Sequence, residues 1–186
     1  GRTVPVEIGR DYMAADRTQK LMSFTEFLDR MEDTNGECVY LAQHDLFDQI
    51  PRLLGDVVIP DFCISSRVQR RIWIGPAGTR TPIHQDPYEN VFCQIVGYKY
   101  MRLYPPRAAP YLQLDTDGMA PNTSTLDIDI HNINDCTYPE ILDSMYSECI
   151  LGPGDAIYIP RGWYHFVKSL TTSFSVSFWW DSHTMD

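Results

Sequence analysis

His84 and Asp86 stand two positions apart in the segment RTPIHQD, which reads as an extended strand. Side chains two apart on a strand point to the same face, so this imidazole and this carboxylate can share a ligand. His165, in the strand-like segment WYHFVKSL, supplies a second imidazole that a β-barrel can bring beside them. Two histidines and one carboxylate on one face are typical of non-haem Fe(II) sites. The alternative is that both histidines are hydrogen-bonded structural residues.

Lys99 is the second residue whose chemistry stands out, in the segment NVFCQIVGYKYMRLY. If Gly97 and Tyr98 form a two-residue hairpin loop, Val96 lies opposite Lys99 and alternate residues of both strands share one face. A lysine among apolar side chains is costly to bury unless an anion pairs with it. The sequence therefore predicts a site for a small carboxylic acid near the triad. The alternative is a solvated face, although the tyrosine-rich opposite face suits an outer surface better. The predicted inner face holds Asn90, Phe92, Gln94, Val96, Lys99, Met101 and Leu103.

Eight short segments between residues 70 and 180 must position these side chains. They are rich in aromatic and β-branched residues and are separated by turn sequences such as GPAG and GPGD. This pattern predicts a closed or double-sheet β architecture. The polar stretch from Pro105 to Glu148 is far longer than an ordinary connection, so we interpret it as a functional or mobile insert.

The first fifty residues predict a strand and two helices. Val4, Val6 and Ile8 alternate as in a strand at the very start, which suggests that the chain begins partway into a longer protein. Ser23 and Glu26 form a capping box that begins a helix. A second, short helix is expected in HDLFDQI, ended by the proline that follows it.

Length, charge and cysteine content limit the classes of function. The 186 residues are enough for one well-buried core, so one domain over residues 1–186 is expected. Fifteen Lys and Arg against 25 Asp and Glu give a net charge of -10, the wrong sign for binding nucleic acid or anionic lipid. The five cysteines form no C-x-x-C and are expected to be free thiols. We expect an intracellular monomer, nuclear or cytoplasmic, with a cationic partner and no direct contact with nucleic acid or membrane.

The sequence resembles the JmjC (Jumonji C) family of Fe(II)- and 2-oxoglutarate-dependent oxygenases. The resemblance extends over most of the chain, through TVPVEIG, YLAQHDLFDQIP, GPAGTRTPIHQDPYEN, GYKYMRLYP, GPGDAIYIP and SFSVSFWW. It implies a mainly β fold, the double-stranded β-helix or cupin-like jelly roll, with a few flanking α-helices and the cofactor inside the barrel mouth.

The resemblance also implies site residues and cofactors. The lysine that pairs with the distal carboxylate of 2-oxoglutarate matches Lys99. Further cosubstrate contacts fall on Tyr40, Thr81 and Asn90. The cofactors implied are Fe(II), 2-oxoglutarate and molecular oxygen. The family's iron ligands match His84, Asp86 and His165.

Four further residues are expected near the substrate. Trp73 and Trp179 match aromatic positions of the family, and Gln43, close to Tyr40 in the sequence, is expected there as well. Glu7 stands where the subfamily has an acidic residue that meets a substrate guanidinium, whose two hydrogen bonds a carboxylate can accept. The alternatives are that the tryptophans are ordinary core and Glu7 is merely solvated. The small face of the last strand is expected to line the cofactor cavity with Ser173, Ser175 and Ser177.

The predicted function is hydroxylation of a protein side chain, arginine in the first place, in a basic protein or peptide. Three alternatives remain open. The first is histone lysine demethylation by the same iron chemistry, and the second is a non-catalytic cupin-like binding module. The third is a zinc hydrolase, which leaves Lys99 and Asn90 unexplained.

Overall fold

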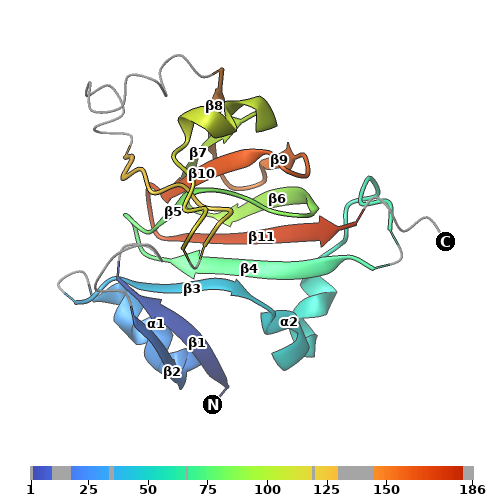
Figure 1. Ribbon diagram of the computed structural model, residues 1–186. Helices are drawn as coiled ribbons and strands as arrows, with labels where there is room; N and C mark the ends of the chain where they lie inside the picture. Colours follow the sequence, from blue (N-terminus) through green and yellow to red (C-terminus); the bar gives the residue numbers. More distant parts are fainter. Residues whose placement is uncertain are drawn as a thin grey trace.

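A computed structural model describes residues 2–9, 18–33, 36–65, 67–118, 120–129 and 145–181. These residues form strands β1 to β11 in two antiparallel sheets, with two short α-helices and two 3-10 helices. Figure 1 shows the strands stacked through the molecule, with β1, β2 and α1 at one end and β7 and β8 at the other. The predicted mainly β, cupin-like fold with few helices is confirmed.

The larger sheet has seven strands in the order β2-β1-β3-β4-β11-β6-β9. β11 lies between β4 and β6, so residues far apart in the sequence become neighbours across the sheet. The strands are β1 (Thr3–Ile8), β2 (Thr18–Ser23), β3 (Val39–His44), β4 (Gln69–Gly75), β6 (Glu89–Val96), β9 (Ala156–Ile159) and β11 (Ser173–Trp180).

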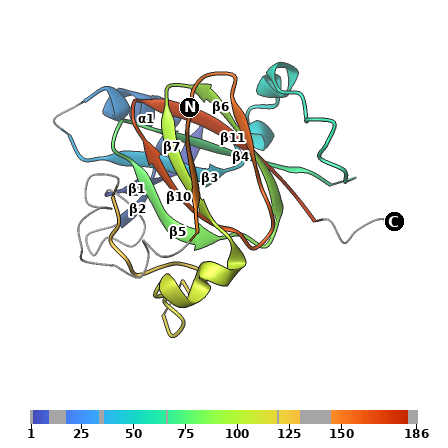
Figure 2. The ribbon, with the colours of Figure 1, turned by 90° about the horizontal axis from the view of Figure 1, so that it is seen from above.

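The smaller sheet has four strands in the order β5-β10-β7-β8, and Figure 2 shows it from above. Among the strands described, β5 therefore has a neighbour, β10, on only one side. The strands are β5 (Arg80–Gln85), β7 (Lys99–Tyr104), β8 (Ser147–Leu151) and β10 (Tyr164–Ser169).

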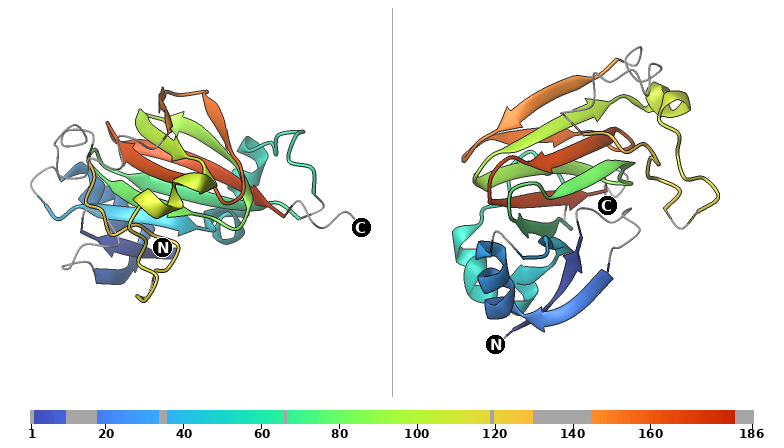
Figure 3. Two further views of the ribbon diagram at one scale, coloured as in Figure 1. Left: turned by 45° about the horizontal axis from the view of Figure 1, so that its top comes forward. Right: turned by 90° about the vertical axis from the view of Figure 1, so that its left-hand side faces the viewer.

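The two expected helices are present. In α1 (Phe24–Glu32) the Ser23 side chain accepts a hydrogen bond from the Glu26 amide at 3.1 Å, the N-cap that the sequence predicts. α2 (Leu46–Gln49) ends before Pro51, which begins the 3-10 helix η1 (Pro51–Asp56). A second 3-10 helix, η2 (Pro106–Tyr111), follows β7. Figure 3 shows α1 and α2 beside the N-terminal strands, away from β8. Of the helices described, none is long and apolar enough to cross a membrane.

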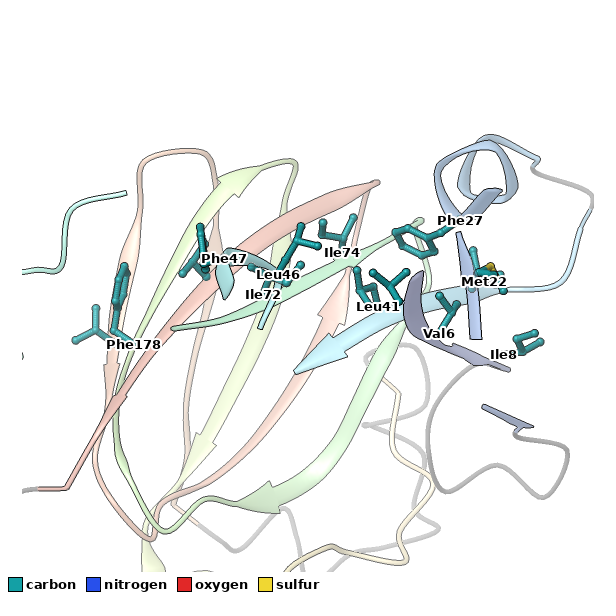
Figure 4. Packing of buried hydrophobic residues seen from close by; sticks show 14 of the residues in the cluster. Val6, Ile8, Met22, Phe27, Leu41, Leu46, Phe47, Ile72, Ile74 and Phe178 are labelled. Atoms are coloured by element: carbon teal, nitrogen blue, oxygen red, sulfur yellow. The ribbon is translucent and has the colours of Figure 1, made fainter. Parts of the chain in front are cut away.

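The main hydrophobic core joins the N-terminal elements to the larger sheet. Val4, Val6 and Ile8 of β1 all point into it, as their alternation predicts, and Glu7 lies on the other face of the strand. Figure 4 shows this cluster running from Ile8 to Phe178. Because β1 and β3 are fixed by this packing, the residues on their other face have a defined position.

The predicted hairpin around Gly97 is wrong. β6 pairs with β11 and β9 in the larger sheet, whereas β7 pairs with β10 and β8 in the smaller one. Gly97 is the corner where the chain changes sheets. Its φ of 73° lies in the left-handed region, and a Cβ there would overlap the carbonyl oxygen of Thr172. Val96 is consequently exposed instead of lying on the inner face, but Lys99 points inward.

The opposite face of β7 was also predicted wrongly, as an outer surface. Arg102 and Tyr104 are buried because part of the 105–148 insert covers them. The guanidinium of Arg102 lies 3.9 Å from the ring centroid of Tyr146 and donates to Glu148 at 2.8 Å. The described part of the insert is therefore packed structure. It buries Ala108, Leu112, Leu126 and Ile128 against Ile83, Tyr104, Tyr164 and Phe166.

Candidate metal centre and cavity

The two strands of the smaller sheet that carry the histidines are direct neighbours. His84 of β5 faces His165 of β10 in the antiparallel register, and their ring centroids lie 4.1 Å apart. Asp86 follows β5 immediately and reaches both rings. Its Oδ1 lies 3.8 Å from His84 Nε2, and its Oδ2 lies 3.7 Å from His165 Nε2. One ligand atom from each of the three residues lies within 4.8 Å of the other two.

Backbone contacts orient both imidazoles. His84 Nδ1 lies 2.9 Å from the carbonyl oxygen of Pro82, and His165 Nδ1 lies 3.3 Å from that of Trp163. A carbonyl can only accept, so each Nδ1 donates and each Nε2 presents its lone pair to the common point. Burial and the nearby His84 ring lower the pKa of His165 well below its usual value, which favours the neutral ring that metals bind. Burial raises the pKa of Asp86.

The donor set fits a first-row divalent metal. Imidazole and carboxylate ligands bind such ions at about 2.0–2.2 Å, and three ligands with the separations seen here can reach one ion after small side-chain movements. The Nδ1 contacts of the histidines are the outer contacts that metal-bound histidines usually make.

A buried recess next to the triad contains the predicted cosubstrate residues. Tyr40, Thr81 and Asn90 line it together with Phe92 and the three candidate ligands. Tyr40 and Thr81 hydrogen-bond through their side chains, and burial raises the pKa of the Tyr40 hydroxyl. Asn90 Oδ1 is buried without a hydrogen-bond partner in the part of the chain that is described. The recess thus offers an unsatisfied polar atom beside the triad. On the same side, Ser177 lines the recess, and Ser173 and Ser175 are fully buried.

Lys99 is the most unusual residue of this region. Its side chain is only 1% exposed, and its Nζ has no hydrogen-bond partner among the residues described. The ammonium lies 5.6 Å from the ring centroid of Tyr40 and 5.4 Å from that of Phe92, and both rings line the recess. Burial lowers the pKa of Lys99 to about 7. A lysine kept at this cost fits a site that receives an anion.

A larger cavity of about 450 Å³ opens from the triad to the surface. Glu7 and Gln43, which the sequence places near the substrate, line it with Trp73 and Trp179. Glu7 is half-buried and faces Tyr40 across the β1–β3 pair. The cavity therefore has a carboxylate and aromatic walls above the triad.

Gln43 is held in an uncommon backbone conformation. Its φ is 53°, and the register between β3 and β4 shifts between Leu41 and His44. A bulge of this kind re-aims a side chain, here to the edge of the cavity. The residue is exposed and sits at the entrance.

The two tryptophans are buried in the protein core and also line the cavity. Trp73 donates from Nε1 to Ser177 Oγ at 2.9 Å, and its ring meets Trp179 edge-on at 6.5 Å. Trp179 is stacked on Tyr88 with ring centroids 5.4 Å apart. Both tryptophans are thus buried and line the cavity, and their contact with the substrate stays a prediction.

Among the cavity-lining residues that sequence reasoning missed are Tyr88, Ala120, Asn122 and Thr123. Tyr88 directly follows the H-x-D-P string, which is the one local signal that could have indicated it. The others belong to the insert, whose polar sequence has no periodicity from which a position could be derived.

The comparisons with known proteins agree with this geometry. Residues 5–186 match the cupin-like domain family. The chain therefore belongs to this family, and the resemblance to JmjC proteins is confirmed by its relatives.

The chain is 44% identical to lysine-specific demethylase JMJ30 of Arabidopsis thaliana, over 97% of this chain and 43% of that protein. It is 42% identical to lysine-specific demethylase 8 of Xenopus tropicalis, over 96% of this chain and 41% of the relative. It is 40% identical to Jumonji C domain-containing protein 5 of Drosophila melanogaster, over 97% and 47%. The chain thus spans less than half the length of these relatives.

Proposed function

We propose that this domain is an Fe(II)- and 2-oxoglutarate-dependent oxygenase that hydroxylates an arginine side chain of a basic protein. The observation that carries the proposal is the buried Lys99 ammonium, which lies against two rings of the recess that the two-histidine, one-carboxylate triad also lines. A zinc hydrolase needs the triad but has no use for this lysine. A cupin-like binding module has no need for both features together.

In this proposal His84, Asp86 and His165 hold the iron, and Lys99 pairs with the distal carboxylate of 2-oxoglutarate. When bound, these cofactors supply the oxidation: 2-oxoglutarate and O₂ give succinate and CO₂, and the second oxygen atom enters the substrate. The chain's own residues bind, orient and exclude water. Asn90 and Thr81 are polar contacts for the cosubstrate, and the Tyr40 hydroxyl stays protonated as a donor because burial raises its pKa.

The larger cavity supports a basic substrate. Its carboxylate at Glu7 can accept two hydrogen bonds from a guanidinium, and the faces of Trp73 and Trp179 suit a planar cation with an aliphatic stem. Gln43 at the entrance can hydrogen-bond the peptide backbone. The net charge of -10 adds a general attraction for a basic partner.

Lysine demethylation is the second candidate, because two of the relatives are named lysine-specific demethylases. Both reactions use the same triad and cosubstrate, so the cavity chemistry decides between them. The guanidinium of arginine is a planar fork that can give the Glu7 carboxylate two hydrogen bonds, whereas a lysine ammonium is a point charge. The cavity therefore favours arginine.

The test is incubation of the protein with Fe(II), 2-oxoglutarate and basic peptide libraries, followed by mass spectrometry. Arginine hydroxylation adds one oxygen atom, whereas demethylation removes a methylene group as formaldehyde. Asp86→Ala serves as the control without activity. Release of succinate without any peptide product would agree with the oxygenase assignment but contradict the proposed substrate. No consumption of 2-oxoglutarate would favour the non-catalytic module.

We also propose that residues 1–186 form one domain and act as an intracellular monomer. The continuous core that joins β1 to β11 supports the single domain. Size-exclusion chromatography with light scattering tests the oligomeric state, and a single cooperative unfolding transition is expected for one domain.

A further inference from the structure

The insert supports the strand that positions two of the triad residues, a role that rests on the proposed function of the triad. β5 carries His84 and leads directly into Asp86, yet it is the edge strand of the smaller sheet. On its inner side it is paired with β10. An edge strand has a row of backbone groups with no sheet partner on its other side, so it is less well fixed than a central strand. Metal ligands on such a strand need support from elsewhere.

The segment Ala120–Ser124 of the insert supplies this support. Thr123 forms an antiparallel bridge with His84, and the Ser124 amide donates to the Ile83 carbonyl oxygen at 2.7 Å. The insert thus acts as a short extra strand on the open edge of β5. Figure 1 shows this part of the chain, in yellow, running beside β5.

Asn122 forms two hydrogen bonds with Gln85, the residue between the two ligands: one with its amide and one with its carbonyl group. The Gln85 amide donates to the carbonyl oxygen of Asn122 at 3.1 Å. The side chain of Asn122 donates back, from Nδ2 to the carbonyl oxygen of Gln85, at 2.9 Å. That carbonyl belongs to the peptide unit that joins Gln85 to Asp86. On the far side, the Gly162 amide donates to the Asp86 carbonyl oxygen at 3.2 Å.

The support itself is anchored firmly. Thr123 is 1% exposed, and Ser124 Oγ donates to the Leu112 carbonyl oxygen at 2.5 Å. Further along, two ion pairs fasten the segment to the smaller sheet. They join Asp127 to Arg80 at 2.6 Å and Asp129 to Lys168 at 2.5 Å. Leu126 and Ile128, which alternate with these two aspartates, are buried.

We propose that Asn122 is a positioning residue of the metal centre. By fixing the Gln85–Asp86 peptide unit it sets the direction of the Asp86 carboxylate relative to the His84 ring. Removal of this hydrogen bond lets the carboxylate deviate and weakens the metal site. Contacts that orient ligands in this way typically change metal affinity by about 10–100-fold.

The test is Co(II) titration of the whole protein, followed by the visible absorption of the bound ion and by thermal unfolding. Asn122→Leu keeps the approximate size of the side chain and removes its donor, and Asn122→Ala is the second variant should the first fold poorly. The matched control is Thr125→Ala. It removes another side-chain hydrogen bond of the insert, from Oγ1 to the Gln113 carbonyl oxygen at 2.9 Å, which does not touch the ligand strand.

We expect Asn122→Leu to bind Co(II) about tenfold more weakly than the wild type, with a changed absorption spectrum. Thr125→Ala is expected to bind Co(II) as the wild type does, whatever it loses in thermal stability. Equal affinity in all three proteins would overturn the positioning role alone. An equal loss in both variants would also overturn it, because the effect would then be general loosening of the insert. If the Asp86→Ala variant bound Co(II) as tightly as the wild type, the proposed metal centre would be contradicted instead.

Discussion

The inner recess and the outer cavity differ in how tightly their residues are held. Asn90 in the recess and Lys99 against two of its rings are almost completely buried, and each has a polar atom without a partner in the described part of the chain. At the entrance, Glu7 is half-buried and Gln43 is exposed. Unsatisfied buried groups are expensive and are kept only where a ligand of fixed chemistry satisfies them. The recess therefore suits one small cosubstrate, whereas the outer cavity leaves room for variation in the substrate.

The largest effect is expected from loss of the triad, on which both regions depend. Asp86→Ala removes the carboxylate that lies near both histidines, so we expect turnover of 2-oxoglutarate to fall by more than about a hundredfold. Succinate release measures it. Glu26→Ala is the matched control, since it removes an exposed carboxylate of α1 that pairs with Arg30, away from the triad and the insert. Comparable activity of Asp86→Ala and the wild type would contradict the metal assignment.

Loss of the buried Lys99 ammonium is expected to affect the recess but not the outer cavity. Lys99→Met leaves the cosubstrate carboxylate without its partner and should weaken 2-oxoglutarate binding by about 2–5 kcal/mol. The same change should not destabilise the protein in the absence of cosubstrate, because an unpaired buried charge is removed. Calorimetric titration and thermal unfolding measure the two effects.

Lys168→Met is the control for this prediction. Lys168 already has its carboxylate, Asp129, at 2.5 Å. Its replacement should therefore lower stability and leave 2-oxoglutarate affinity unchanged, the reverse of the Lys99 result. If Lys99→Met retained full affinity, the cosubstrate site would have to be elsewhere.

Much of this arrangement could be predicted from the sequence, but not all. Alternation fixed the inward faces of β1 and β11, and the H-x-D spacing placed His84 and Asp86 together. The corner at Gly97 could not be predicted, because a glycine between two apolar strands indicates a hairpin and a change of sheet equally well. The support from the insert was also hidden. It depends on backbone hydrogen bonds to β5, which any residue type can form.

The pH dependence of cosubstrate binding is a smaller effect of the same recess. Burial lowers the pKa of Lys99 to about 7 when no anion is present, and a bound carboxylate raises it. The complex then holds one proton more than the free protein above pH 7. Affinity for 2-oxoglutarate should fall by up to about tenfold per pH unit between pH 7 and 9. Titrations at several pH values measure this slope, and Lys99→Met should abolish it. A slope that persists in the variant would assign the effect to another group.

The pKa of Lys99 also has a consequence for stability. The unfolded chain holds the lysine proton up to its ordinary pKa of 10.5, while the folded protein without cosubstrate releases it near 7. The unfolded state therefore binds more protons within this range, and stability should rise with pH from about 7 towards 10. Comparison of wild type and Lys99→Met by denaturant unfolding isolates the contribution. It is absent if both proteins show the same pH dependence.

The smallest effect is expected at the entrance, where solvent weakens charge interactions. Glu7→Gln keeps the shape of the side chain but removes the charge that would face a guanidinium. We expect KM for an arginine peptide to rise about tenfold with little change in kcat, since Glu7 is not a metal ligand and a half-exposed contact gives the lower part of the range for charged hydrogen bonds. A lysine peptide, which cannot form the paired contact, should be turned over slowly by both proteins. Glu26→Gln, on the exposed surface of α1, is the control. Equal turnover of arginine and lysine peptides by the wild type would remove the arginine preference, and the choice of substrate would then lie with the tryptophans and Tyr88 instead of with Glu7.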